Sequence, residues 1–175
     1  DTEGCLLHRK GIESELSSIK NQISYSLNPP AGYYLRNIHI HGSRYQAEIE
    51  GEVQIGGISL QHPGRHNLEN ALAAAALAHQ AGIGADDIRN GLNSFTGVKR
   101  RFEIHLQTQN NIYVDDYAHH PEEISACIRS AREMWPGKRI TGVFQPHLYS
   151  RTRDLAEQFA ESLSQLDEVI LLDIY

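Results

Sequence analysis

Apolar and polar residues alternate along much of residues 21–60, most clearly in the stretches RNIHIHG and RYQAEIE. Alternation with a period of two predicts strands that are buried on one face and exposed on the other. Gly42-Ser43 and Gly56-Gly57 predict hairpin turns, because glycine accepts the positive φ that such turns require. We therefore expect an antiparallel β meander in this part of the chain.

Helical patterns flank the meander. Residues 71–81 are rich in alanine, which favours a helix, with Asn67 as a plausible N-cap and Gly82 at its end. ADDIRNGLNSF predicts a second, shorter helix, and residues 11–20 carry a weak helical pattern. The polar residues 97–101 then predict a boundary between two domains.

Beyond this boundary, strands and helices alternate. RFEIHLQ and NIYVDDY are predicted strands joined by a turn at residues 109–111, and Pro121 opens a helix with acidic residues in its first turn. KRITGVFQ, TRDLAEQFAESLSQL and EVILLDIY predict strand, helix and strand. Such alternation is typical of an α/β fold with a parallel sheet covered on both faces, whose ligands bind at the C-terminal strand ends.

Composition limits the classes of function. The chain has 175 residues and a net charge of −6, which argues against a nucleic-acid partner because binding of bulk phosphate requires a basic surface. No apolar run approaches the ~20 residues that span a bilayer, so we expect no membrane partner. Cys5 and Cys127 lie far apart, which favours a reduced, cytoplasmic protein. Because the chain begins with Asp1 and ends on a strand-like run, we expect a piece of something longer.

The stretch YVDDYAHH places several titratable groups between a predicted strand and a predicted helix. A carboxylate there could hold a sugar hydroxyl, and a histidine could meet an anion or transfer protons. The alternative is that Asp116 or His120 only caps the next helix while its neighbours face water. The stretch alone favours neither the ligand-binding interpretation nor the capping one.

FQPHLYSR repeats this arrangement one strand later, with His147 and Arg151 near the strand end. Convergence of the two strand ends would make a basic cleft suited to a carboxylate or a phosphate. A solvated helix start is the less favoured alternative. The histidines show no zinc-binding spacing, and we expect no metal ligands in this chain.

Two further stretches lie at junctions. GRHNLEN places Asn67 and Asn70 three residues apart, on one face near a helix N-terminus, where side-chain amides could pair with an adenine edge. An ordinary cap beside an exposed asparagine is the alternative, and composition alone favours it. In KRRFE, a basic residue on a hinge could approach a phosphate when domains close, although basic linkers are common for solubility.

GRHNLENALAAAALA, GVKRRFE, YVDDYAHHPEEI and FQPHLYSRTRDL occur in this order and together resemble the Mur ligase family, the ATP-dependent enzymes of peptidoglycan precursor synthesis. The resemblance implies that residues 1–97 are the back part of a central ATPase domain, which holds the β meander. It implies that residues 98–175 are the front part of a Rossmann-like, parallel-sheet C-terminal domain. FQPHLYSRTR favours the member that joins L-alanine to UDP-N-acetylmuramate over the murein tripeptide ligase or folylpolyglutamate synthetase.

The resemblance also implies ATP and Mg²⁺ as cofactors, with the Mg²⁺ ligands outside this chain, and it assigns several residues of this chain to ATP. Asn67 and Asn70 would contact the adenine with His66 alongside, Asp116 would hold the ribose, and Arg101 would reach the phosphates.

Further roles concern catalysis and the substrates, UDP-N-acetylmuramate and L-alanine. His119 would act in catalysis together with Arg101. Tyr117 would line the cleft, and His147 and Arg151 would help to hold a substrate carboxylate. In such enzymes ATP phosphorylates the carboxylate, and the amine attacks the acyl phosphate.

The chain departs from the family pattern in what it lacks. It contains no GxxGKT phosphate loop and no counterpart of the family's Mg²⁺ ligands or UDP-binding domain. We expect the isolated chain to be inactive. The alternatives are another Mur-family ligase, or a non-catalytic nucleotide-binding or interaction module, and an upstream GxxGKT would exclude the latter.

Overall fold

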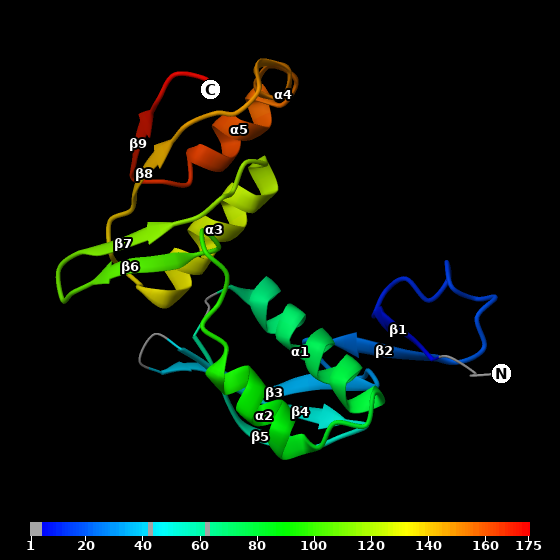
Figure 1. Ribbon diagram of the computed structural model, residues 1–175. Helices are drawn as coiled ribbons and strands as arrows, with labels where there is room; N and C mark the ends of the chain where they lie inside the picture. Colours follow the sequence, from blue (N-terminus) through cyan, green and yellow to red (C-terminus); the bar gives the residue numbers. More distant parts are fainter. Residues whose placement is uncertain (1–4, 42–43, 62–63) are drawn as a thin grey trace. The chain divides into compact units, whose positions relative to one another are not determined.

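The protein is described by a computed structural model that covers residues 5–41, 44–61 and 64–175 (Figure 1). Its chain divides into two compact units, unit 1 with residues 1–96 and unit 2 with residues 97–175.

Unit 1 is built on a five-stranded sheet in which the strands lie in chain order. These strands are β1 (Leu6–Arg9), β2 (Gln22–Ser26), β3 (Tyr33–His41), β4 (Arg44–Gly51) and β5 (Ile55–Leu60). β3, β4 and β5 pair antiparallel, which confirms the predicted meander for these three strands.

Two helices pack on this sheet, as Figure 1 shows. Helix α1 (Arg65–Gln80) contacts β2 and β3, and α2 (Ala85–Ser94) contacts β5. Alternation along β4 buries its apolar positions. The Tyr33 side chain is fully buried, and its hydroxyl lies 2.7 Å from His79 Nδ1 and accepts a hydrogen bond of 2.7 Å from Gln80 Nε2, which ties β3 to the end of α1.

The structure corrects two predictions for the meander. β2 pairs with β3 in parallel, because the period of two identifies a strand but carries no information about the direction of its neighbour. Gly56-Gly57 lies within β5 rather than in a turn, and the chain reverses earlier, after Gly51 at φ 114°. The predicted turn at Gly42-Ser43 lies outside the described residues.

Two helix predictions are also wrong. Residues 11–20 form turns rather than a helix, with isolated bonds such as that from Glu15 N–H to the Ile12 carbonyl. Ile12 and Ile19 are exposed, so this segment has no buried apolar face to stabilise a short helix. Asn67 is not the N-cap of α1, because the helix begins at Arg65.

Unit 2 combines a hairpin with a strand–helix–strand arrangement. Its elements are β6 (Glu103–Gln107), β7 (Ile112–Asp115), α3 (Pro121–Met134), β8 (Thr141–Phe144), α4 (Tyr149–Asp154), α5 (Ala156–Leu163) and β9 (Glu168–Leu171). β6 and β7 pair antiparallel around the predicted turn, and β8 pairs with β9 in parallel. The α/β fold class is confirmed.

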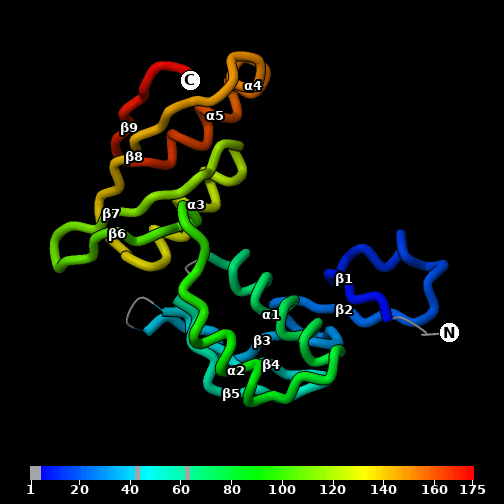
Figure 2. Tube along the Cα trace, in the orientation of Figure 1, coloured from blue at the N-terminus to red at the C-terminus, as the bar shows by residue number. Residues whose placement is uncertain are grey.

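Figure 2 traces the chain from β9 to its end beside the loop that follows β8, where Leu148 N–H donates to the Tyr175 carbonyl.

Three features of unit 2 differ from the prediction. β7 and β8 belong to separate two-stranded sheets among the described residues, rather than to one sheet. The single helix expected at residues 152–166 is divided at Leu155 into α4 and α5. Helices α3 and α5 form one buried apolar cluster with Phe144, whereas every residue of β9 is exposed, so the predicted cover on both faces is absent along β9.

No helix in the described part of the chain is both long and apolar enough to cross a membrane.

Candidate functional site

The loop between β7 and α3 is anchored by Asp116, the carboxylate that the resemblance assigns to a ribose. Its Oδ2 accepts the Phe102 backbone N–H at 2.7 Å, and its Oδ1 accepts the Ala118 N–H at 2.7 Å. Phe102 is only 2% exposed and has a positive φ of 48°. The carboxylate therefore fixes the segment that enters β6 against the end of β7.

A second set of contacts joins the basic hinge to the same loop. The Tyr117 N–H donates to the Arg100 carbonyl at 2.7 Å, and the Arg100 guanidinium lies 5.0 Å from the centre of the Tyr117 ring. A cation at this distance from an aromatic face is attracted to it. The stretches KRRFE and YVDDYAHH are separate in the sequence but contact each other in the fold.

The two adjacent histidines have different environments. His120 is the N-cap of α3, and its Nδ1 accepts the Glu122 N–H at 3.4 Å. The possibility that His120 caps the following helix is therefore confirmed. His119 has another set of partners, with Nδ1 3.0 Å from the Tyr117 carbonyl and its ring in an edge contact with the Tyr117 ring.

Glu123, in the first turn of α3, connects Arg101 and His119. Its Oε1 lies 4.0 Å from Arg101 Nη1, and its Oε2 lies 3.5 Å from His119 Nδ1. Oε2 also accepts the N–H groups of His119 at 3.0 Å and His120 at 3.2 Å, which completes a capping box. Partial burial raises the pKa of Glu123, but the hydrogen bonds and the nearby charges of His119 and Arg101 outweigh it and lower the pKa below 4.5.

Sequence reasoning missed Glu123 as a site residue. The only signal was its position three residues after His120, the spacing of a capping box. That spacing predicts a cap but not contacts with Arg101, which is distant in sequence.

His147 and Arg151 lie at the other predicted strand end, after β8. The His147 ring stacks on the Tyr175 ring with centres 5.7 Å apart, and Arg151 is half-buried in α4. Since β7 and β8 do not pair among the described residues, the structure does not bring the two strand ends together in one sheet. Their joint cleft stays a prediction.

The candidate adenine residues lie in unit 1, in the first two turns of α1. His66 and Asn70 are exposed, and Asn67 is half-buried. A separation of three residues on a helix places the two amides on one face, as predicted.

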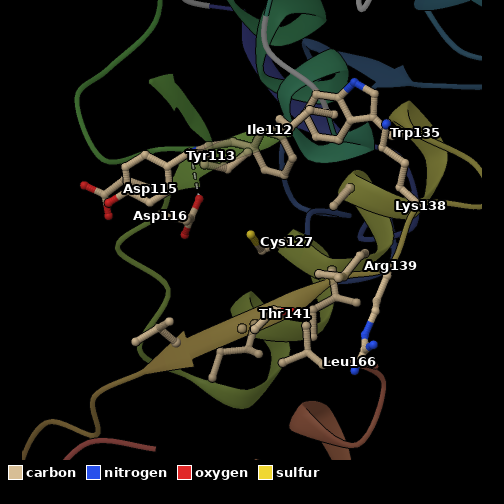
Figure 3. Close-up of a pocket in the computed structure, with 18 of the residues that line it drawn as sticks. Ile112, Tyr113, Asp115, Asp116, Cys127, Trp135, Lys138, Arg139, Thr141 and Leu166 are labelled. Carbon is tan, nitrogen blue, oxygen red and sulfur yellow. Dashed lines mark hydrogen bonds between the residues drawn. The ribbon is translucent and has the colours of Figure 1, made fainter. Parts of the chain in front are cut away.

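A cavity of about 910 Å³ lies between β7, β8 and α3 (Figure 3). The Cys127 thiol points into it from α3, and burial raises the pKa of this thiol to about 12. The Trp135 Nε1–H is buried and has no hydrogen-bond acceptor among the described residues. A thiol that stays protonated at neutral pH is a poor nucleophile, so Cys127 is not a candidate for covalent catalysis. Asp116 of the β7–α3 loop also lines this cavity.

Glu103, His105 and Asp115 place potential ligand atoms within 4.8 Å of one another on the β6–β7 hairpin. Arg100 already lies at this cluster, with Nε 3.5 Å from Asp115 Oδ2 and its backbone N–H bonded to Glu103 Oε2 at 2.8 Å. These residues therefore form an ion-pair cluster in which the Arg100 guanidinium supplies the positive charge.

Known proteins resemble this chain in sequence and in fold. Residues 100–174 match the family described as Mur ligase, glutamate ligase domain. UDP-N-acetylmuramate–L-alanine ligase of Porphyromonas gingivalis strain W83 is 55% identical over 177 aligned positions, which cover 98% of this chain and 39% of the relative. The Parabacteroides distasonis enzyme of the same name is 44% identical over 176 positions, covering 99% and 38%.

A solved structure shows the same relationship. The crystal structure of UDP-N-acetylmuramate-alanine ligase MurC from Thermotoga maritima superposes with a TM-score of 0.75 at 30% identity, covering 94% of this chain and 37% of that one. The chain thus spans less than two fifths of the length of these two curated relatives. With the ordered motifs and the α/β fold, these matches show that residues 100–174 belong to the Mur ligase family and that nearly the whole chain is similar to one part of its L-alanine-adding members.

Proposed function

We propose that the chain is part of an ATP-dependent ligase that joins L-alanine to UDP-N-acetylmuramate during synthesis of peptidoglycan precursors in the cytoplasm. The observation that carries this proposal is the 55% identity to a relative of that name over nearly the whole chain. The order of the four motifs and the anchoring of YVDDYAHH by the basic hinge support it.

Unit 1 is proposed to be the C-terminal part of the central ATP-binding domain. The side chains of His66, Asn67 and Asn70 come from one helix terminus, and amides offer both donors and acceptors to an adenine edge. The ligands for Mg²⁺ are proposed to lie outside these 175 residues.

Unit 2 is proposed to be the N-terminal part of the C-terminal domain. Each Asp116 oxygen already accepts one backbone N–H, and each keeps a second lone pair that a ribose hydroxyl could use. Arg101 is proposed to stabilise phosphate charge. His119 is proposed to act beside it, since both side chains meet one carboxylate.

Tyr117, His147 and Arg151 are proposed to bind substrate. Tyr117 is half exposed beside His119, and a guanidinium such as that of Arg151 matches a carboxylate in charge and geometry. ATP bound with Mg²⁺ would supply the phosphoryl group that activates the carboxylate of UDP-N-acetylmuramate.

A chimeric enzyme tests this function. The segment replaces the matching residues of the P. gingivalis ligase, and phosphate release is measured with ATP, UDP-N-acetylmuramate and L-alanine. We expect turnover that requires all three substrates, and none from the 175-residue chain alone. Turnover with a tripeptide in place of alanine would assign the segment to a tripeptide ligase. A folded chimera without turnover would refute the proposal.

A further inference from the structure

Glu123 carries more contacts than a helix cap requires. A capping box needs one acceptor at the third helical position, and glutamine fills that role as well as glutamate. In this protein the carboxylate also faces two side chains, Arg101 through Oε1 and His119 through Oε2.

These two side chains come from different segments and are both partly exposed. The Arg101 side chain is 54% exposed and the His119 side chain is 38% exposed. A long, exposed arginine samples many rotamers, and a fixed negative charge beside it restricts those rotamers. Glu123 itself is held in place, because Oε2 accepts two backbone N–H groups.

We propose that Glu123 is a positioning residue for the ligation reaction, which orients the Arg101 guanidinium and the His119 imidazole toward the reacting groups. This inference rests on the proposed function. Its carboxylate acts through these two side chains and does not touch substrate. Because misplacement of catalytic groups by about 1 Å can cost about a hundredfold in rate, loss of the charge should lower kcat by about ten- to a hundredfold.

The first test uses the chimeric enzyme with three substitutions. Glu123→Gln keeps a capping acceptor but removes the charge, Glu123→Ala removes both, and Glu122→Gln removes the neighbouring exposed charge from the same helical turn. We expect Glu123→Gln to lower kcat at neutral pH while the KM for alanine stays unchanged and Tm changes little. Glu123→Ala should lower both Tm and kcat, and Glu122→Gln should lower neither.

The second test needs no activity. Relaxation of the ¹⁵N nuclei in arginine Nε–H groups is measured by NMR in the 175-residue chain, with Arg101 assigned from an Arg101→Lys variant. We expect Arg101 to be more ordered in wild type and in Glu122→Gln than in Glu123→Gln.

Wild-type kcat in Glu123→Gln, or an equal loss in Glu122→Gln, would overturn the inference. Equal order of Arg101 in all three proteins would also overturn it. An inactive chimera would speak against the proposed function alone, because the NMR comparison would still decide whether Glu123 orders Arg101.

Discussion

Substitution of Asp116 by alanine should destabilise unit 2 by a measurable amount. Alanine removes two hydrogen bonds of 2.7 Å from backbone N–H groups to a carboxylate. Hydrogen bonds to a charged group contribute about 1.5–3 kcal/mol each, and because Asp116 is only half-buried we take the lower end for each. The free energy of unfolding should therefore fall by about 3 kcal/mol.

Asparagine at this position should have an intermediate effect. Its amide offers one carbonyl oxygen as an acceptor, and its NH₂ group would face the second backbone donor. The N–H of Phe102 or of Ala118 would then lose its acceptor. We expect a loss of about half that of Asp116→Ala.

Urea unfolding followed by tryptophan fluorescence measures this effect. Trp135 is the only tryptophan in the sequence, and its ring stacks on Phe102 with centres 6.0 Å apart, so its emission reports on the segment that Asp116 anchors. Asp115→Ala is the matched control. Asp115 makes partly exposed ion pairs, at 3.5 Å to Arg100 and 3.9 Å to His105, whose loss should cost at most about 1 kcal/mol.

The losses of stability in Asp116→Ala and Asp115→Ala together show whether the Asp116 carboxylate anchors the loop. If Asp116→Ala costs no more than Asp115→Ala, the carboxylate does not anchor the loop, and Asp116 is free to serve a ligand alone. If the loss is as large as expected, ATP kinetics of an Asp116 variant in the chimera must be corrected for unfolding before they are attributed to ribose binding.

Three further results are expected. Tyr33→Phe should lower the free energy of unfolding by about 1–3 kcal/mol, because it removes the buried hydroxyl that ties β3 to α1; circular dichroism in urea would show this, and an unchanged midpoint would contradict it. A thiol reagent should modify the exposed Cys5 in the native protein but Cys127 only after unfolding, because burial raises the pKa of Cys127 to about 12. Labelling is followed by mass spectrometry, and modification of Cys127 in the native protein would contradict the prediction. Folding lowers the pKa of Glu123, so the contribution of its carboxylate to stability should be present above pH 4.5 and be lost as the pH falls through the folded pKa. The difference in Tm between wild type and Glu123→Gln should therefore shrink at acid pH, and a difference that grows at acid pH would refute this reasoning.

Local features of the fold follow from the sequence because they depend on residues close together in the chain. The alternation of RYQAEIE specifies β4, with Tyr45 and Ile49 buried in the core. Pro121 begins α3, since its fixed φ suits the first helical position and its missing N–H needs no acceptor there. The order of the motifs likewise identifies the family without any contact between them.

Contacts between distant segments decided the rest. The direction of β2 beside β3 and the separation of β7 from β8 depend on which strand edges meet, and a period of two is the same for either arrangement. The candidate site shows the same limit. The sequence indicates Asp116 and His119 as candidates, but the hydrogen bond from Phe102 to Asp116 and the approach of Arg101 to Glu123 exist only because folding brings the hinge against the start of α3.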